Sequence, residues 1–277
     1  AIAPVLTKVF DSLYHHGLGG EGDRFKRSLL RLFGPSILSG FPGACTCHTA
    51  PEDETLENFL QGYGFSSLGD VDSLGFPPIT WAMHAAPAKI VEAIIAERPD
   101  MLQTCPEHDV APIGHAVSRP PAEFKQIVAL CKEAASPPQV DHLSLAGYSA
   151  VDRAAKQGFH ENLQTLLEMK AAIEPRRKHN GCTPLLSAAE NGFDRCCEVL
   201  LQFRANLEAV DNFGQTALHY AAQPLAVLGN GDPEGKLKVL QVLLSARANT
   251  KRFDAQGRTP LLVAAENNFH AATQLLS

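Results

Sequence analysis

The sequence predicts an all-α protein, built as a solenoid of stacked helix-turn-helix units with hairpin loops and preceded by an N-terminal helical extension. Three observations lead to this prediction. One short motif recurs along the chain, and recurrence at a fixed period is typical of repeat architectures. Only 7% of the residues are aromatic although 45% are hydrophobic, which favours thin Ala–Leu layers over one large core. Each copy of the motif also carries signals that start and end helices.

The first element, residues 1–70, lies outside the repeats and reads as helices followed by a Pro/Gly-rich linker. Residues 2–13 have apolar side chains at helical spacing. Residues 23–33 combine an apolar face with several basic side chains. Such a basic amphipathic helix either lies on an anionic membrane or docks into a partner, or it packs on the first repeat as a cap. Thr55 to Gln61 suits one or two further helical turns.

The second element, residues 71–277, contains the recurring motif, which is clearest at Gly181–Gly192. Residues equivalent to its Thr183 lie at positions 77, 111, 149, 183, 216 and 259, so successive copies are 34, 38, 34, 33 and 43 residues apart. Six copies at a period of about 33 residues do not arise by chance. The repeats therefore start near residues 75, 109, 147, 181, 214 and 257.

Each copy predicts a pair of helices. Thr or Ser before Pro supplies an N-cap and a first helical residue whose missing N–H costs nothing. Paired small residues such as Ala188 and Ala189 let neighbouring helices approach closely. Gly158 and Gly192 end the first helix in the left-handed conformation. A second helix follows, with an aliphatic pair near its end, and a single unit cannot bury its own apolar face without neighbours.

These residues resemble the ankyrin repeat family, over about three quarters of the chain. The motif Gly-x-Thr-Pro-Leu-x-x-Ala-Ala-x-x-Gly, the Leu-Leu pairs and Arg204-Ala-Asn carry the resemblance. The family usually has His after Thr-Pro-Leu, and only His219 retains it here. The family's Gly after the second helix is replaced by Lys170, Arg204 and Arg247, and a positive φ at these residues would cost roughly 1 kcal/mol each.

Two features depart from a regular array. The copy starting at Gly214 has a long insertion at residues 223–235, rich in turn residues and with an apolar patch. It is either a tolerated surface insertion or a partner-specific contact. At the C-terminal end, Leu275 and Leu276 are followed by nothing that could cover them. We therefore expect further chain or another subunit to cover this end.

Composition and charge exclude several classes of protein. The net charge of −6 provides no overall basic excess for nucleic-acid binding. Residues 79–96 are the most apolar stretch, but His, Pro, Lys and Glu interrupt it, so we expect no transmembrane span. Seven cysteines, an odd number, argue against a disulfide framework and for a reducing intracellular compartment.

Motifs for catalysis and cofactors are weak. The Gly17-x-Gly-x-x-Gly22 string follows a helical pattern rather than a strand, so loop chemistry explains it better than dinucleotide binding. Cys45, Cys47 and His48 could supply three zinc ligands but have no fourth ligand at the usual spacing. No hydrolase, metalloprotease or phosphate-loop signature occurs. We expect no enzyme activity, catalytic residue, metal or cofactor.

The remaining functional signal is a surface. The resemblance implies that partners contact the hairpin tips and the exposed face of the first helices. Trp, Tyr and Arg are enriched among residues that dominate binding energy, and the basic clusters indicate an acidic segment on the partner. The resulting candidates are Trp81, His84, Arg153, Lys156, Arg176, Arg177, Lys178, Glu190, Phe213, Tyr220, Lys251 and Arg252.

The function predicted from this surface is non-catalytic protein–protein binding, by a scaffold, an adaptor or a stabilising subunit of a larger assembly. Two alternatives stay open. The basic helix at residues 23–33 would make the chain a membrane-surface anchoring protein. Otherwise the chain is the regulatory part of a longer enzyme.

Overall fold

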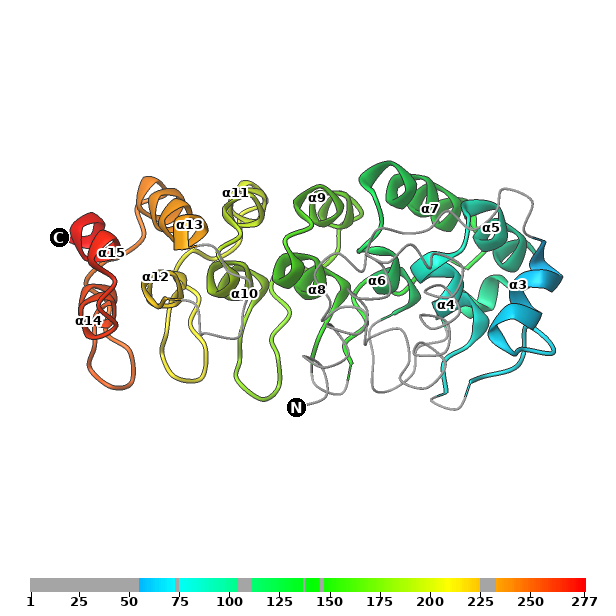
Figure 1. Cartoon of the computed structure of the whole chain (residues 1–277), viewed down its shortest axis with the longest axis horizontal. Coiled ribbons are helices and arrows are strands. Elements are labelled where there is room, and N and C mark those ends of the chain that lie inside the picture. Colours follow the sequence, from blue (N-terminus) through cyan, green and yellow to red (C-terminus); the bar gives the residue numbers. More distant parts are fainter. Residues whose placement is uncertain (1–54, 73–74, 104–110, 137, 145–146, 225–232) are drawn as a thin grey trace, which may run out of the picture. The chain divides into compact units, whose positions relative to one another are not determined.

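The computed structural model describes residues 55–72, 75–103, 111–136, 138–144, 147–224 and 233–277 (Figure 1). Over these ranges the regular elements are helices and no strand is assigned, so the all-α prediction is confirmed. The chain forms two compact units. Unit 1 comprises residues 1–106 and 118–138, and unit 2 comprises residues 107–117 and 139–277. The boundary expected near residue 70 stays a prediction.

Unit 1 contains four α-helices and one 3-10 helix among its described residues. Helix α5 packs against α3, α4 and α7. Apolar side chains such as Phe59, Ile79, Met83, Ile94 and Phe124 form its core and are at most 1% exposed. Thr55 caps the first helix, as its predicted position suggests, by accepting the Asn58 N–H at 3.2 Å. The helices are α3 (Leu56–Tyr63), α4 (Pro78–Ala85), α5 (Ala88–Glu97), η2 (Pro99–Gln103) and α7 (Pro121–Glu133).

Unit 2 arranges its helices in two rows, with α8, α10, α12 and α14 in one and α9, α11, α13 and α15 in the other (Figure 1). Neighbours within each row pack on each other, and α6 packs on α8. Hairpin loops project beyond the first row (Figure 1). The helices are α6 (Pro112–Ala116), α8 (Ala150–Gln157), α9 (His160–Glu168), α10 (Pro184–Asn191), α11 (Asp194–Gln202), α12 (Ala217–Ala222), α13 (Pro233–Ser245), α14 (Pro260–Glu266) and α15 (His270–Leu276).

The helix signals in unit 2 act as predicted. Ser149, Thr183 and Thr259 each accept the N–H of the residue three positions on, at 3.0, 3.5 and 3.3 Å. Gly158 and Gly192 end their helices with φ of 83° and 76°. An alanine at Gly158 would be strained at this φ, and its Cβ would also lie 2.8 Å from the Phe193 ring.

The non-glycine residues after the second helices have a positive φ. Lys170, Arg204 and Arg247 have φ of 64°, 67° and 66°. Each follows the last turn of α9, α11 or α13, where the amide N–H of the residue donates back to a helix carbonyl. The family's glycine conformation is therefore kept by larger residues, at roughly 1 kcal/mol each.

Small and aliphatic side chains fill the space between the layers of unit 2. The paired alanines of α8, α10 and α12 are fully buried, as are Leu166, Leu200 and Leu243 of the second row. Cys196 and Cys197 are also fully buried and pack as small apolar residues. The expectation that both C-terminal leucines lack cover is wrong for Leu276, which is 8% exposed because it lies one turn from the buried Ala272 on the packed face of α15, whereas Leu275 is 38% exposed.

Several predictions fall on residues that the structure does not describe. These are the Gly17–Gly22 string, the basic helix at 23–33, the Cys45–His48 segment and most of the insertion, residues 225–232. The last three residues of the insertion, 233–235, begin helix α13. Among the helices that are described, none has the length and apolar character needed to cross a bilayer.

Candidate protein-binding surface

The residues predicted to bind a partner divide into exposed and buried groups. Lys156, Arg176, Lys178, Glu190, Phe213, Lys251 and Arg252 are exposed, while Arg153 and Tyr220 are half-buried. Trp81, His84 and Arg177 are buried, at 2%, 7% and 4% exposure. The expectation that these three side chains face outward is therefore wrong, and we exclude them from the candidate surface.

Trp81 is buried because its hairpin turns back over it. The indole N–H donates to Asp72 Oδ2 at 3.0 Å, and its ring lies 5.4 Å from the Tyr63 ring. Asp72 Oδ1 also accepts the Phe76 N–H at 2.9 Å. The tryptophan therefore fixes a loop within unit 1. His84 lies one turn further along α4, a helix whose residues from Pro78 to His84 are all buried.

Arg177 is buried because it forms an ion pair inside unit 2. Its guanidinium donates to both oxygens of Asp152 at 3.1 Å and to Ser187 Oγ at 2.7 Å. Ser187 in turn donates to Asp152 Oδ1 at 2.8 Å. The guanidinium also lies over the Tyr148 ring, 4.8 Å from its centroid. Removing one partner from such a pair would leave an uncompensated buried charge, so Arg177 serves the fold.

The other basic residues of these two repeats remain at the surface, and we name Arg153, Lys156, Arg176 and Lys178 the basic surface. Lys156 lies on the Tyr148 ring, with Nζ 5.5 Å from the ring centroid. Arg176 Nη1 donates to the Val210 carbonyl at 2.8 Å, so part of its hydrogen-bonding capacity is used. Lys178 extends from a hairpin tip and is exposed. An acidic partner would find most of this charge available.

Two phenylalanines are displayed further along the chain, and we name Phe213 and Phe253 the aromatic surface. They are 60% and 65% exposed, the largest exposures among the large apolar residues that the structure describes. The sequence pointed to Phe213 but missed Phe253. Phe253 directly precedes Asp254, and the residues at the equivalent position of the two preceding repeats are Val210 and the buried Arg177. This position in the repeat is the sequence signal that could have identified Phe253.

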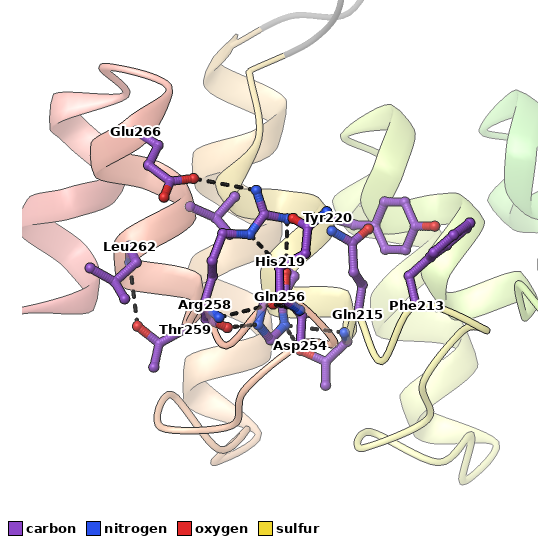
Figure 2. Close-up of polar contacts among 12 residues, drawn as sticks. Phe213, Gln215, His219, Tyr220, Asp254, Gln256, Arg258, Thr259, Leu262 and Glu266 are labelled. Atoms are coloured by element: carbon purple, nitrogen blue, oxygen red, sulfur yellow. Dashed lines mark hydrogen bonds and ion pairs between the residues drawn. The ribbon is translucent and has the colours of Figure 1, made fainter.

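The backbone below these rings is held by two aspartates. Asp211 Oδ1 accepts the N–H groups of Phe213 and Gln215 at 2.9 and 2.8 Å, and its Oδ2 accepts the Tyr220 hydroxyl at 2.9 Å. Figure 2 shows Tyr220 beside the Phe213 hairpin, and the next hairpin held through Asp254 and Arg258. Burial, with the hydrogen bond to Asp211, raises the Tyr220 pKa far above its usual value, so the phenol stays a neutral donor.

Asp254 repeats this arrangement one hairpin further on. Its Oδ1 accepts the N–H groups of Gln256 and Arg258, both at 2.9 Å, and its Oδ2 accepts the Arg258 guanidinium at 2.8 Å. Arg258 also reaches Glu266 on α14 at 3.3 Å (Figure 2). Arg258 is thus held in place, and the hairpin that carries Phe253 is rigid.

His219 lies between the two hairpins and is fully buried. Its Nδ1 accepts the Thr216 N–H at 3.2 Å, which leaves Nε2 to donate to the Arg258 carbonyl at 3.0 Å (Figure 2). Burial lowers the pKa of His219, so the imidazole is neutral in the fold. Its role is to link two repeats, in agreement with its predicted place at a helix start.

The described residues offer little for catalysis. Among them, no group of three or more His, Cys, Asp or Glu side chains is placed to hold a metal ion. Burial raises the pKa of Cys131 and Cys196 to about 12 and that of Cys182 to about 11. These thiols therefore stay protonated at neutral pH and lack the thiolate that a nucleophile requires.

Comparison with known proteins finds repeats in the same part of the chain. Residues 151–230 match a family model described as three copies of the ankyrin repeat, and residues 213–254 match a model of the single ankyrin repeat. The mouse (Mus musculus) protein Inversin is 31% identical over 113 residues, which is 41% of this chain and 10% of Inversin. Human (Homo sapiens) neurogenic locus notch homolog protein 1 is 34% identical over 101 residues, 36% of this chain and 4% of that protein.

A solved structure extends the likeness to most of the chain. The ankyrin repeat domain of Bcl-3, described as a unique member of the IkappaB protein family, superimposes with a TM-score of 0.58. The alignment covers 90% of this chain and 96% of that domain at 20% sequence identity, a likeness that shows the fold alone. The chain spans a tenth or less of the two curated relatives named above.

Proposed function

Because the chain is an ankyrin-repeat protein, we propose that it acts as a non-catalytic protein–protein interaction module, as a scaffold, an adaptor or a stabilising subunit of a larger assembly. Ankyrin repeats are in general modules that bind other proteins. The proposal assigns the contact to unit 2, through the basic surface and the aromatic surface. It also assigns the chain to a reducing intracellular compartment, on the odd number of cysteines in the sequence.

The observation that carries the proposal is the rigid exposure of Phe213 and Phe253. Large rings are ordinarily buried, and here both are more than half exposed although the chain has few aromatic residues. Their hairpins are already ordered by Asp211 and Asp254. A partner that covers the rings gains apolar burial without having to order the loop, and this preorganisation favours affinity.

The basic surface adds selectivity for an acidic partner. Lys178 forms no ion pair with any described residue, and Lys156 Nζ lies 5.5 Å from the centroid of the Tyr148 ring. Exposed charges of this kind raise the association rate and suppress binding of basic proteins more than they add affinity. We therefore expect partner binding that weakens as salt is added.

Affinity capture with matched variants tests the proposal. The double variant Phe213→Ala/Phe253→Ala and the double variant Lys156→Glu/Lys178→Glu should each lose partners that the wild-type protein retains, and quantitative mass spectrometry of the captured proteins measures this. The controls are Phe203→Ala, which removes an exposed ring at the end of α11, and Arg195→Glu, at a side chain that is 69% exposed on the same helix.

The controls should capture the same partners as the wild type, and all variants should keep its thermal unfolding midpoint. If the surface variants retain every partner at normal stability, the assignment of binding to these two surfaces is wrong.

A further inference from the structure

A groove of about 570 Å³ lies in unit 1, between α3 and the C-terminal end of α5, and we name it the α3–α5 groove. The two helices pack on each other (Figure 1). The groove is lined by the apolar residues Leu56, Leu60 and Leu68 and by the charged residues Glu57, Glu97 and Arg98. Leu56 and Leu60 are half-buried, so part of their apolar surface still faces solvent. Covering this surface with another apolar segment would be favourable.

The charge available at the α3–α5 groove is negative. Glu57 and Glu97 are exposed and form no ion pair with any described residue. The Arg98 guanidinium donates to both oxygens of Asp100, at 2.9 and 2.7 Å, so its positive charge is already paired. The groove therefore combines an apolar lining with two carboxylates that no described cation neutralises, and it suits an apolar segment that carries positive charge.

The sequence of residues 23–33, which lie outside the described ranges, has this chemistry. The segment contains four basic side chains and one acidic side chain. Phe25, Leu29 and Leu32 recur at the spacing of one helix face. Such a segment offers an apolar stripe to the leucines of the groove and cations to Glu57 and Glu97. The two are therefore complementary in both apolar surface and charge.

The short connection between the segment and the groove favours this occupant over a segment of another protein. Residues 34–54 follow the segment, and α3, which lines the groove, begins at Leu56. A chain of this length reaches at most about 70 Å when it is fully extended. Tethering over such a short range gives an effective concentration on the order of mM. A separate protein with the same chemistry would have to compete with this concentration.

We propose that the α3–α5 groove binds the chain's own basic segment, residues 23–33. The leucines of the groove receive the apolar stripe of the segment, and Glu57 and Glu97 pair with its cations. While it is bound there, the segment is not available to the anionic membrane that its sequence also suits. The inference concerns unit 1 and does not depend on the proposed function, which uses surfaces of unit 2.

Hydrogen exchange of the full chain, measured by mass spectrometry of peptides that cover residues 23–33, tests the contact. The segment should exchange at least about tenfold more slowly in the wild type than in the groove variant Glu57→Lys/Glu97→Lys, which repels the cations and opens the contact. Both substitutions are at exposed sites. Glu92→Lys, at an exposed site on α5 that does not line the groove, is the matched control and should leave the exchange unchanged.

Reversing the charges on both sides separates pairing from a general effect of charge. Adding Arg27→Glu/Arg31→Glu to the groove variant should restore the slow exchange, since opposite charges then face each other again. Fast exchange of the segment in the wild type, equal exchange in the groove variant, an equal effect of Glu92→Lys, or no restoration would each overturn the proposal. So would slow exchange that appears only when vesicles of phosphatidylcholine and phosphatidylserine are added, because the segment would then be a membrane anchor.

Discussion

Helices α4, α5 and α7 of unit 1 start in a different way from the first-row helices α8, α10, α12 and α14 of unit 2, whereas α3 of unit 1 is capped by Thr55. In unit 1, α4, α5 and α7 begin after Pro77, Pro87 and Pro120, none of which makes a side-chain cap hydrogen bond. In unit 2, α8, α10, α12 and α14 begin at Ser or Thr residues whose hydroxyls accept a backbone N–H. Proline fixes the direction of the backbone but has no side-chain acceptor for the free N–H groups of the first turn.

Unit 1 compensates at the other end of a helix. The Arg119 guanidinium, 3% exposed, donates to the carbonyls of Ala82, Met83 and Ala86 at 2.6, 2.7 and 2.6 Å. A single residue thus satisfies the C-terminal turn of α4. In unit 2 the corresponding contributions are spread over several caps and left-handed glycines. The difference shows that irregular repeats can retain the fold when one buried arginine makes several hydrogen bonds, in place of caps and glycines that recur in every repeat.

The largest expected effect comes from removing that contact. Arg119→Met should lower the free energy of unfolding of unit 1 by about 3–5 kcal/mol, because several buried carbonyls lose their donor and Glu123 loses its ion pair. Trp81, the single tryptophan and 2% exposed, reports on this unit by fluorescence during urea unfolding.

Arg98→Met provides the control, because Arg98 pairs with Asp100 in a half-exposed position, and such pairs contribute about 0–1 kcal/mol. If Arg119→Met lowers the free energy of unfolding by less than 1 kcal/mol, the hydrogen bonds of Arg119 do not stabilise unit 1 as a concentrated contact. The contrast between the two units would then fail.

A smaller effect is expected from the distributed caps of unit 2. Ser149→Ala removes the hydroxyl that accepts the Asp152 N–H at 3.0 Å, and the loss of such a cap costs about 1 kcal/mol. Ser149→Thr keeps the acceptor and should stay within a few tenths of a kcal/mol of the wild type. Hydrogen exchange of the α8 amides measures both, since fraying at the helix start exposes them first. Equal exchange in the two variants would contradict a capping role.

The same contrast explains which parts of the structure could be predicted from the sequence. Caps and glycine ends depend on neighbours within a few residues, and these were predicted correctly. The contacts that bury Trp81 and Arg177 depend on Asp72, nine residues away, and on Asp152, 25 residues away. Equivalent positions in the repeat hold different residues, so register alone does not tell whether a side chain faces solvent.

The candidate surface illustrates the same limit. Lys156, Lys178 and Phe213 were found because turn and helix-face positions are exposed by default, and they are exposed in the structure. Phe253 was missed because its position precedes the turn, where the equivalent Arg177 is buried. In the structure Phe253 is 65% exposed, so the same position of the repeat is buried in one hairpin and exposed in another.

The smallest expected effect is on the pH dependence of stability. It distinguishes a link between repeats made by His219 hydrogen bonds from links made by apolar residues at the equivalent positions. His219 is neutral and buried where equivalent positions have Leu186 and Leu262. Because burial lowers the folded-state pKa of His219 below its usual value near 6.5, the unfolded chain binds a proton more readily. The stability contribution is complete above about pH 6.5 and is lost as the pH falls toward the folded-state pKa. The wild type should therefore lose stability between pH 7.5 and 5.5.

His219→Leu should reduce this loss without abolishing it, since burial also holds the pKa of His115 well below its usual value. Chemical denaturation of wild type and variant at both pH values measures the difference, and ion pairs common to both proteins cancel. His270→Leu, at an exposed site on α15, serves as the comparison variant for the removal of a histidine. If His219→Leu shows the full wild-type loss, His219 is already protonated or its imidazole is not confined by Thr216 and Arg258, and His219 then contributes nothing to the link between the repeats at 214 and 257.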